Sequence, residues 1–238
     1  MDSPNGATRS APIDDRLYFR QLLSGRDFAV DDPVASQMVN FVYAIGDRAS
    51  GECVLVDPAY DPAELLNRVA ADGMKVVGVL ATHYHADHVG GSLFGTTIPG
   101  IVELLEHVSC PIHVQRDEVP WVVRAAGVAE DDLVRHDSGD TVTVGELAIE
   151  LVHTPGHTPG SQCFLVAGKL VSGDTLFLDG CGRTDLPGSD HALMIESLKR
   201  LSLVDDDVIL YPGHRYSLAS SATMAAVKQS NYVFEALA

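Results

Sequence analysis

Apolar and polar residues along the first third of the chain form a pattern of short strands around one helix. Residues 41–45 and 54–56 are largely apolar and are separated by GDRASGE, a glycine-bounded turn, so they predict an opening β-hairpin. Asp61 then offers a helix N-cap, Pro62 suits the first helical position, and Gly73 can end the helix. The pattern therefore predicts a hairpin followed by a capped helix.

The next predicted strand leads directly into a polar cluster. Residues 76–81 are almost wholly apolar, as expected of a strand buried on both faces between helical layers, and His83 follows at once. Beyond the cluster, residues 91–100 predict a loop, residues 101–107 a short helix and residues 111–114 a short strand.

The second half contributes strands and helices of its own. Residues 141–152 alternate apolar and polar side chains around Gly145-Glu146, which predicts a tight hairpin turn. Further strands are predicted at residues 163–166, 170–172 and 208–211, and helices at residues 193–201 and 219–228. No short-period repeat, low-complexity tract or linker divides the chain. We therefore expect one domain over residues 1–238, with a polar N-terminal segment over about residues 1–16.

Composition narrows the class of protein. With 46% hydrophobic residues, the 238-residue chain is typical of a globular protein that buries a sizeable core. Its 16 basic and 33 acidic side chains give a formal charge of −17, which disfavours nucleic acid and anionic membranes as partners. The polar N-terminus lacks the apolar stretch of a secretory signal, and no run approaches the ~20 apolar residues of a membrane span. We expect a cytoplasmic protein.

The densest chemical signal is THYHADH at residues 82–88. It places four side chains that can bind metal, His83, His85, Asp87 and His88, directly after a buried strand. His83 and His85 alternate along an extended backbone, and a turn would carry Asp87 and His88 elsewhere, so the four can divide between two ions. A polar surface loop that happens to be rich in histidine is the weaker interpretation.

Three later motifs add further metal ligands. PGHTPGS contains His157 between two Pro-Gly turns, SGDT contains Asp174 at a strand end, and YPGH contains His214. Individually, these residues have ordinary explanations as a turn histidine, a helix cap and a surface histidine. Together with THYHADH they favour a metal centre.

In this order the motifs resemble those of the metallo-β-lactamase superfamily. The resemblance covers roughly residues 41–216, and FLDGCGRTDLPG at residues 177–188 is similar to the branch that contains glyoxalase II (hydroxyacylglutathione hydrolase) and persulfide dioxygenases. The implied fold is an α/β, four-layer αββα sandwich, with two mixed β-sheets facing each other and helices on the outer faces. The metals would lie at one edge.

The resemblance also implies the ligand set and the reaction. One divalent ion would be bound by His83, His85 and His157, a second by Asp87, His88 and His214, and Asp174 would bridge them. Zinc is the first choice of metal, with iron or manganese as alternatives. Asp87 and Asp174 are the catalytic carboxylates of this reading, in which metal-bound hydroxide attacks a thioester carbonyl and releases a thiol.

Two other functions stay open. A persulfide dioxygenase would hold a single Fe(II) with two histidines and one carboxylate. This chain offers such a set in His83, His157 and Asp174. The thiol carrier is open as well, because glutathione-using hydrolases usually have a lysine and a tyrosine where this chain has Arg183-Thr184-Asp185. A non-catalytic metal-binding scaffold is the third interpretation, which we disfavour because no expected ligand is missing.

Contacts to the substrate are harder to predict. Arg183 and Arg215 can bind an anionic thiol through paired hydrogen bonds, although each can equally pair with a neighbouring acid in so acidic a chain. Tyr216 can bond substrate or pack against the core. The expected partner is a small thiol-derived molecule, with neither nucleic acid nor membrane, and a homodimer is compatible with the sequence.

Overall fold

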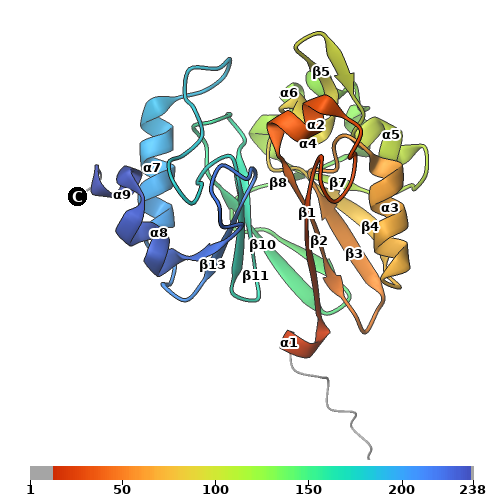
Figure 1. The fold of residues 1–238 in the computed structure, drawn as a ribbon, viewed down its shortest axis with the longest axis horizontal. Helices are drawn as coiled ribbons and strands as arrows, with labels where there is room; N and C mark the ends of the chain where they lie inside the picture. The colour runs from red at the N-terminus through yellow and green to blue at the C-terminus, as the bar shows by residue number, and fades with distance from the viewer. Residues whose placement is uncertain (1–12, 237–238) are drawn as a thin grey trace, which may run out of the picture.

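Two six-stranded mixed sheets form the centre of the computed structural model, which describes residues 13–236 (Figure 1). The first sheet has the strand order β1-β2-β3-β4-β7-β8, with β1 to β3 antiparallel and β3, β4, β7 and β8 parallel. These strands are Leu17–Leu23, Phe41–Asp47, Glu52–Val56, Lys75–Leu80, Ile112–Gln115 and Leu133–His136. Short helices at Ile13–Arg16 (α1) and Pro33–Met38 (α2) flank β1. Residues 1–12 of the predicted polar N-terminal segment lie outside the described residues.

The second sheet comes from the other half of the chain and has the order β14-β13-β12-β11-β10-β9. Only β12 and β13 pair in parallel. Its strands, from β9 to β14, are Thr141–Val144, Leu147–His153, Gln162–Val166, Lys169–Gly173, Ile209–Pro212 and Ala222–Thr223. The predicted two-residue turn at Gly145-Glu146 is confirmed, since Val144 pairs with Leu147.

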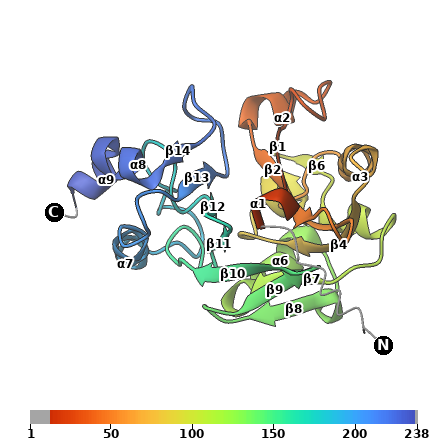
Figure 2. The same cartoon turned by 90° about the horizontal axis from the view of Figure 1, so that it is seen from below.

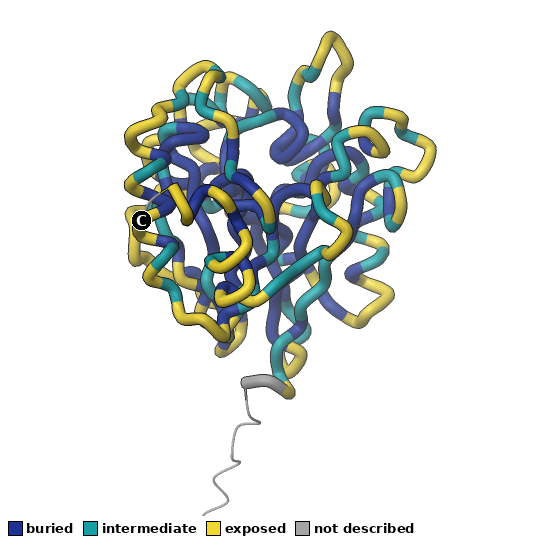
Figure 3. The backbone as a smooth tube through the Cα atoms, turned by 60° about the vertical axis from the view of Figure 1, so that its left-hand side comes forward, coloured by how far each residue is buried: buried dark blue, intermediate teal, exposed yellow. Residues whose placement is uncertain are grey.

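Three apolar clusters separate four layers of structure. One cluster lies between the first sheet and helices α3 (Pro62–Ala71), α5 (Ile101–Leu105) and α6 (Val119–Ala126). A second joins the inner faces of the two sheets, and a third lies between the second sheet and α7 (His191–Leu201), α8 (Met224–Ser230) and α9 (Tyr232–Glu235). Figure 2 shows α7, α8 and α9 gathered on the outer side of the second sheet, and Figure 3 shows the buried segments inside the molecule. The predicted αββα sandwich is confirmed.

Local signals in the first half position the site-bearing loops. Helix α3 begins where the sequence predicts, with the Asp61 side chain accepting the Glu64 N–H at 2.9 Å. The helix returns the chain to β4, which pairs in parallel on both sides and ends three residues before His83. Because the carboxyl ends of parallel strands meet at one sheet edge, the loops after β3 and β4 lie together there.

Two predicted elements are wrong. Residues 91–100 form a small hairpin, β5 (Gly91–Leu93) and β6 (Thr96–Ile98), instead of a loop. Its turn places Phe94 at φ 51°, a conformation that sequence patterns do not associate with phenylalanine. The predicted C-terminal helix begins at Met224 instead of residue 219, because Ala222–Thr223 pairs with β13 and Thr223 caps the helix. Within residues 13–236, no helix has the length and apolar character of a membrane span.

Candidate metal centre

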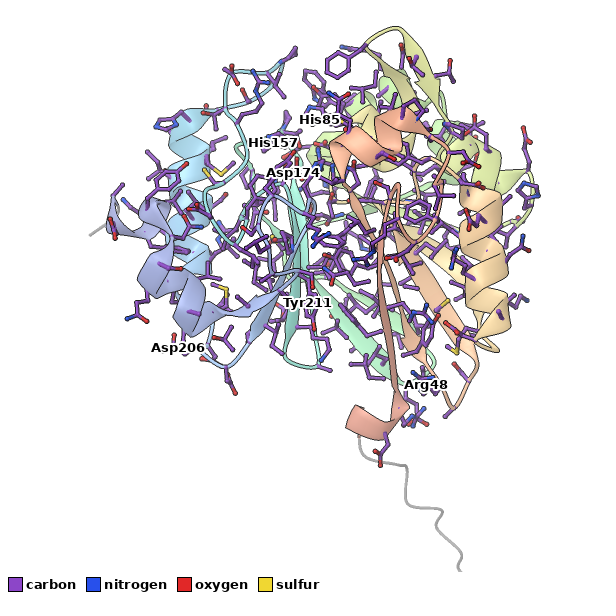
Figure 4. All side chains as sticks on the ribbon, in the orientation of Figure 1. Arg48, His85, His157, Asp174, Asp206 and Tyr211 are labelled. Carbon is purple, nitrogen blue, oxygen red and sulfur yellow. The ribbon has the colours of Figure 1, made fainter. Side chains whose placement is uncertain are left out.

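The seven predicted metal ligands converge at one edge of the two sheets. His83 and His85 follow β4, while Asp87 and His88 belong to the short helix α4 (Ala86–Val89). The other three ligands come from the second sheet. His157 lies in the loop after β10, Asp174 directly follows β12, and His214 lies two residues after β13. Figure 4 shows His85, His157 and Asp174 side by side between the two halves, far from Arg48 and Asp206. All seven are buried except His85, which is half-buried.

One trio comprises His83, His85 and His157. The Nδ1 atom of His85 lies 3.0 Å from the Nε2 atoms of both other rings. The His157 Nδ1 lies 2.9 Å from the carbonyl oxygen of Arg183, which can only accept, so Nδ1 carries a proton and Nε2 has a lone pair when the ring is neutral. The His83 Nδ1 likewise faces the Thr82 hydroxyl at 2.9 Å, and that hydroxyl donates to Asp57 at 2.6 Å. Lone pairs therefore point into the trio.

The second trio, Asp87, His88 and His214, has the same arrangement. His214 donates from Nδ1 to the Met38 carbonyl oxygen at 2.8 Å, which leaves its Nε2 unprotonated when the ring is neutral. His88 Nδ1 lies 2.8 Å from Asp57, and the two Nε2 atoms face each other at 3.2 Å. Oxygen Oδ2 of Asp87 lies 3.6 Å and 3.5 Å from these two Nε2 atoms.

Asp174 lies between the two trios. Its Oδ2 is 3.6 Å from His157 Nε2 and 3.3 Å from His214 Nε2, while its Oδ1 is 3.5 Å from His88 Nε2. Oδ1 is buried and has no hydrogen-bond partner among the described residues. A buried carboxylate oxygen without a donor is costly unless a cation binds it. The position suits a ligand shared by two ions.

Charge in the site favours a bound cation. Burial raises the pKa of Asp174, but His214 and His88 outweigh this effect and hold the pKa well below the usual value, so that the carboxylate is ionised. Burial lowers the pKa of His88, but Asp87 and Asp174 outweigh it and raise the pKa to about 10. By contrast, burial and the neighbouring His88 and His85 hold the pKa of His83 well below its usual value. Asp87 and Asp174 thus favour a proton on His88 that divalent cations could replace.

Two supporting residues were not predicted. Asp57 accepts hydrogen bonds from the Thr82 N–H at 2.8 Å and the Thr82 hydroxyl, and contacts His88. Asn40 donates to Asp87 Oδ2 at 3.1 Å. The signal for Asp57 was an acid directly after β3, the parallel neighbour of β4. Asn40 carries no such signal, because it lies 47 residues before Asp87 and only the folded chain brings the two together. Such partners orient metal ligands.

A cavity of about 770 Å³ opens over both trios. Side chains from both halves line it, including Met38, Tyr84, Leu93, Phe94, Phe177, Leu186, Tyr216 and Tyr232 around the ligands. Its walls are largely apolar, which is typical of a small-molecule site.

The predicted substrate residues have different surroundings. Arg183 lines the cavity, but its guanidinium pairs with Asp185 at 2.6 Å and 2.7 Å. Tyr216 also lines the cavity and stacks on His214, with ring centroids 4.8 Å apart. Arg215 is exposed and lies outside the cavity lining, so its contact with substrate stays a prediction without structural support. Arg124 of α6, which we did not predict, lines the cavity.

A four-layer sandwich with a three-histidine trio and an aspartate–histidine trio at one edge defines a class of metalloprotein. The chain belongs to the metallo-β-lactamase superfamily, whose family model matches residues 37–214. A hydroxyacylglutathione hydrolase from Rhodopseudomonas palustris (strain ATCC BAA-98 / CGA009) is 35% identical over 201 residues, which are 84% of this chain and 71% of that protein. This relative places the chain in the branch of the superfamily that contains the hydroxyacylglutathione hydrolases.

Solved structures are similar to this chain as well. ETHE1 from Myxococcus xanthus superposes with a TM-score of 0.71 and 30% identity, over 90% of this chain and 83% of that chain. TTHA1623, solved in a di-iron-bound form, superposes with a TM-score of 0.66 and 25% identity, over 82% of this chain and 94% of that chain. Both share the fold of this chain.

Proposed function

We propose that this chain is a metal-dependent hydrolase that cleaves thioesters of small thiols, in the manner of glyoxalase II. The observation that carries the proposal is the convergence of seven metal-binding side chains from both sheets at the base of one cavity. The identity to a hydroxyacylglutathione hydrolase over most of the chain supports the reaction class.

The residues present suit two divalent ions. His83, His85 and His157 would hold one, Asp87, His88 and His214 the other, and Asp174 would contact both. The mix of imidazole and carboxylate suits zinc first, with iron and manganese as alternatives, and the di-iron form of TTHA1623 supports a pair of ions. When bound, divalent ions supply hydroxide at neutral pH, by lowering the pKa of water toward about 7, and polarise a carbonyl.

The chain's own residues would bind and orient the substrate. Phe177 and Tyr216, whose rings lie 5.0 Å apart beside His214, would form an apolar wall against which the thioester packs. Arg183 and Arg124 are the basic side chains of the cavity lining and would attract a carboxylate of the thiol part. A thiolate leaves readily, so no side chain is needed as a strong general acid.

A persulfide dioxygenase is the competing function. It would use His83, His157 and Asp174 for a single Fe(II), and the 3.6 Å separation of His157 and Asp174 is compatible with such a group. The two functions differ in whether oxygen is consumed. A single domain, a cytoplasmic location and a homodimer stay predictions.

The test compares two aspartates in the full-length protein. Asp174→Asn removes the charge of the shared ligand, and Asp206→Asn changes an exposed aspartate that pairs with Lys228 far from the site (Figure 4). We expect hydrolysis of S-lactoylglutathione by the parent, without oxygen uptake on glutathione persulfide. We also expect a loss of at least about 100-fold in Asp174→Asn and parental activity in Asp206→Asn. Oxygen uptake that depends on persulfide, without hydrolysis, would support the dioxygenase instead.

A further inference from the structure

A buried carboxylate outside the ligand set touches both loops of the first trio. Glu118 ends the 3₁₀ turn Arg116–Glu118 before α6 and is 1% exposed. Its Oε1 accepts the Tyr84 N–H at 2.7 Å, and its Oε2 accepts the Gly160 N–H at 2.6 Å. Each oxygen therefore anchors a different loop.

The two anchored loops carry all three ligands of the first trio. Tyr84 lies between His83 and His85, after a strand of the first sheet, and Gly160 lies three residues after His157, in a loop of the second sheet. The contact with Gly160 is close, because a Cβ added there would lie 2.4 Å from the Glu118 nitrogen. Glu118 thus connects the two sheets where the first trio forms.

The buried environment of Glu118 disfavours the ionised form of its carboxylate. No basic side chain pairs with it among the described residues. Burial raises its pKa to about 7, while hydrogen bonds from the Thr158 hydroxyl and from the Tyr84 and Gly160 N–H groups lower it. An apolar residue would avoid this cost but would leave two N–H groups without acceptors. The two oxygens of the carboxylate therefore satisfy one N–H group in each loop, which an apolar side chain could not do.

We propose that Glu118 is a positioning residue that fixes His83 and His85 relative to His157 and so sets the affinity of the first trio for its ion. This inference rests on the proposed metal centre. Gln162 provides a further link, since its N–H donates to Thr82 O at 3.0 Å, so removing Glu118 weakens the connection without abolishing it.

The sharpest change is Glu118→Gln. Glutamine has nearly the same shape, but only one of its terminal atoms accepts, so its amide group meets an N–H donor and one loop loses its anchor. Glu64→Gln is the matched control, because Glu64 also accepts a backbone N–H, that of Ala29 at 3.0 Å, but touches neither loop. Glu118→Asp keeps both acceptors on a shorter side chain and serves if the glutamine variant does not fold.

The experiment measures the affinity of each site for Zn²⁺ by competition with a chelator in the full-length protein. We expect two sites in the parent. In Glu118→Gln, the affinity of one site falls about 10- to 100-fold, while the other stays within about threefold of the parent. Glu118→Asp shows a smaller loss at the same site, and Glu64→Gln shows none.

Three results would overturn the inference. Two unchanged affinities would show that the loops hold their positions without Glu118. An equal fall at both sites would indicate general destabilisation instead of positioning. A parent that binds no Zn²⁺ would refute the proposed metal centre, and the role of Glu118 with it. The parent thus tests the proposed function, and the difference between parent and variant tests Glu118.

Discussion

At the scale of single residues, the site is organised by hydrogen bonds on the outer side of each imidazole. Carbonyl oxygens of Arg183 and Met38 accept from Nδ1 of His157 and His214, so that the inner nitrogens carry lone pairs when the rings are neutral. The motifs predict the ligands but not these acceptors, because a backbone carbonyl can belong to any residue type. The sequence could therefore indicate the candidate metal ligands but not how they are oriented.

Arg124 gives a prediction about substrate charge. Its guanidinium lies over Trp121, 5.5 Å from the ring centroid, at the cavity. Arg48 is a matched control, exposed and 5.2 Å from the Tyr18 centroid, at the far end of the molecule (Figure 4). We expect Arg124→Met to raise KM for S-lactoylglutathione about twofold to fivefold with kcat unchanged. The effect is small because an exposed ion pair contributes only about 0.2–1 kcal/mol.

Steady-state kinetics on two substrates check this prediction. A thioester without a carboxylate in its thiol part should show the same KM in Arg124→Met as in the parent, and Arg48→Met should match the parent on both substrates. Equal effects on the charged and uncharged substrates would mean that Arg124 does not recognise the anion.

His113 gives a prediction about pH and stability. Burial and the nearby His136 lower the pKa of His113 to about 4. The Nδ1 of His113 lies 2.9 Å from the Nε2 of His136, and the Nδ1 of His136 lies 3.3 Å from an Asp140 oxygen. An unfolded histidine has a pKa of about 6.5. Between about pH 6.5 and about pH 4, the unfolded chain therefore binds more protons at this position than the folded chain does. The free energy of unfolding decreases as the pH falls through that range.

Urea unfolding at several pH values tests the role of His113. His113→Asn should flatten the decrease relative to the parent, whereas His107→Asn, at an exposed position, should leave it unchanged. Subtracting the parental curve removes the titrations that all three proteins share. A parental slope in His113→Asn would disprove the assignment.

At the scale of elements, α3 depends on the cap that its sequence predicts. Asp61 accepts the Glu64 N–H at 2.9 Å, and Pro62 occupies the first turn. Asp61→Ala should lower the free energy of unfolding by about 1 kcal/mol, as for other N-cap aspartates. Chemical denaturation measures this, with Asp61→Asn, which keeps an acceptor, expected to retain most of the stability. A loss as large in Asp61→Asn would contradict capping.

Elements with local signals could be predicted, whereas those that depend on distant partners could not. Helix α3 has its cap and the hairpin of β9 and β10 has its turn. Strand β14 is only two residues long and exists because Ala222–Thr223 pairs with β13. We also made no prediction for α6, which positions Arg124 and follows Glu118.

At the scale of the whole molecule, the proposed metal centre would join the two sheets. His83 to His88 come from the first sheet, and His157, Asp174 and His214 come from the second. Ions that bind only the folded state stabilise it by mass action, so their removal should loosen this edge. At a free ion concentration 100 times Kd, a bound ion stabilises the folded state by about 2.7 kcal/mol. We therefore expect a chelator to lower Tm by about 5–10 °C.

Thermal unfolding with and without chelator checks this expectation. Asp174→Asn should show a smaller shift than the parent, because the shared ligand has lost its charge, whereas Asp206→Asn should show the parental shift. Identical shifts in both variants would place the stabilising ions elsewhere.

The central claim is that the two trios hold two divalent ions per chain. The most direct measurement is the metal content per chain, by elemental mass spectrometry on protein purified without added metal, combined with the assay for S-lactoylglutathione hydrolysis. The account predicts a content close to two ions per chain in hydrolytically active protein, and a lower content in Asp174→Asn. A content close to one iron per chain, in protein that consumes oxygen on a persulfide and does not hydrolyse the thioester, would contradict it.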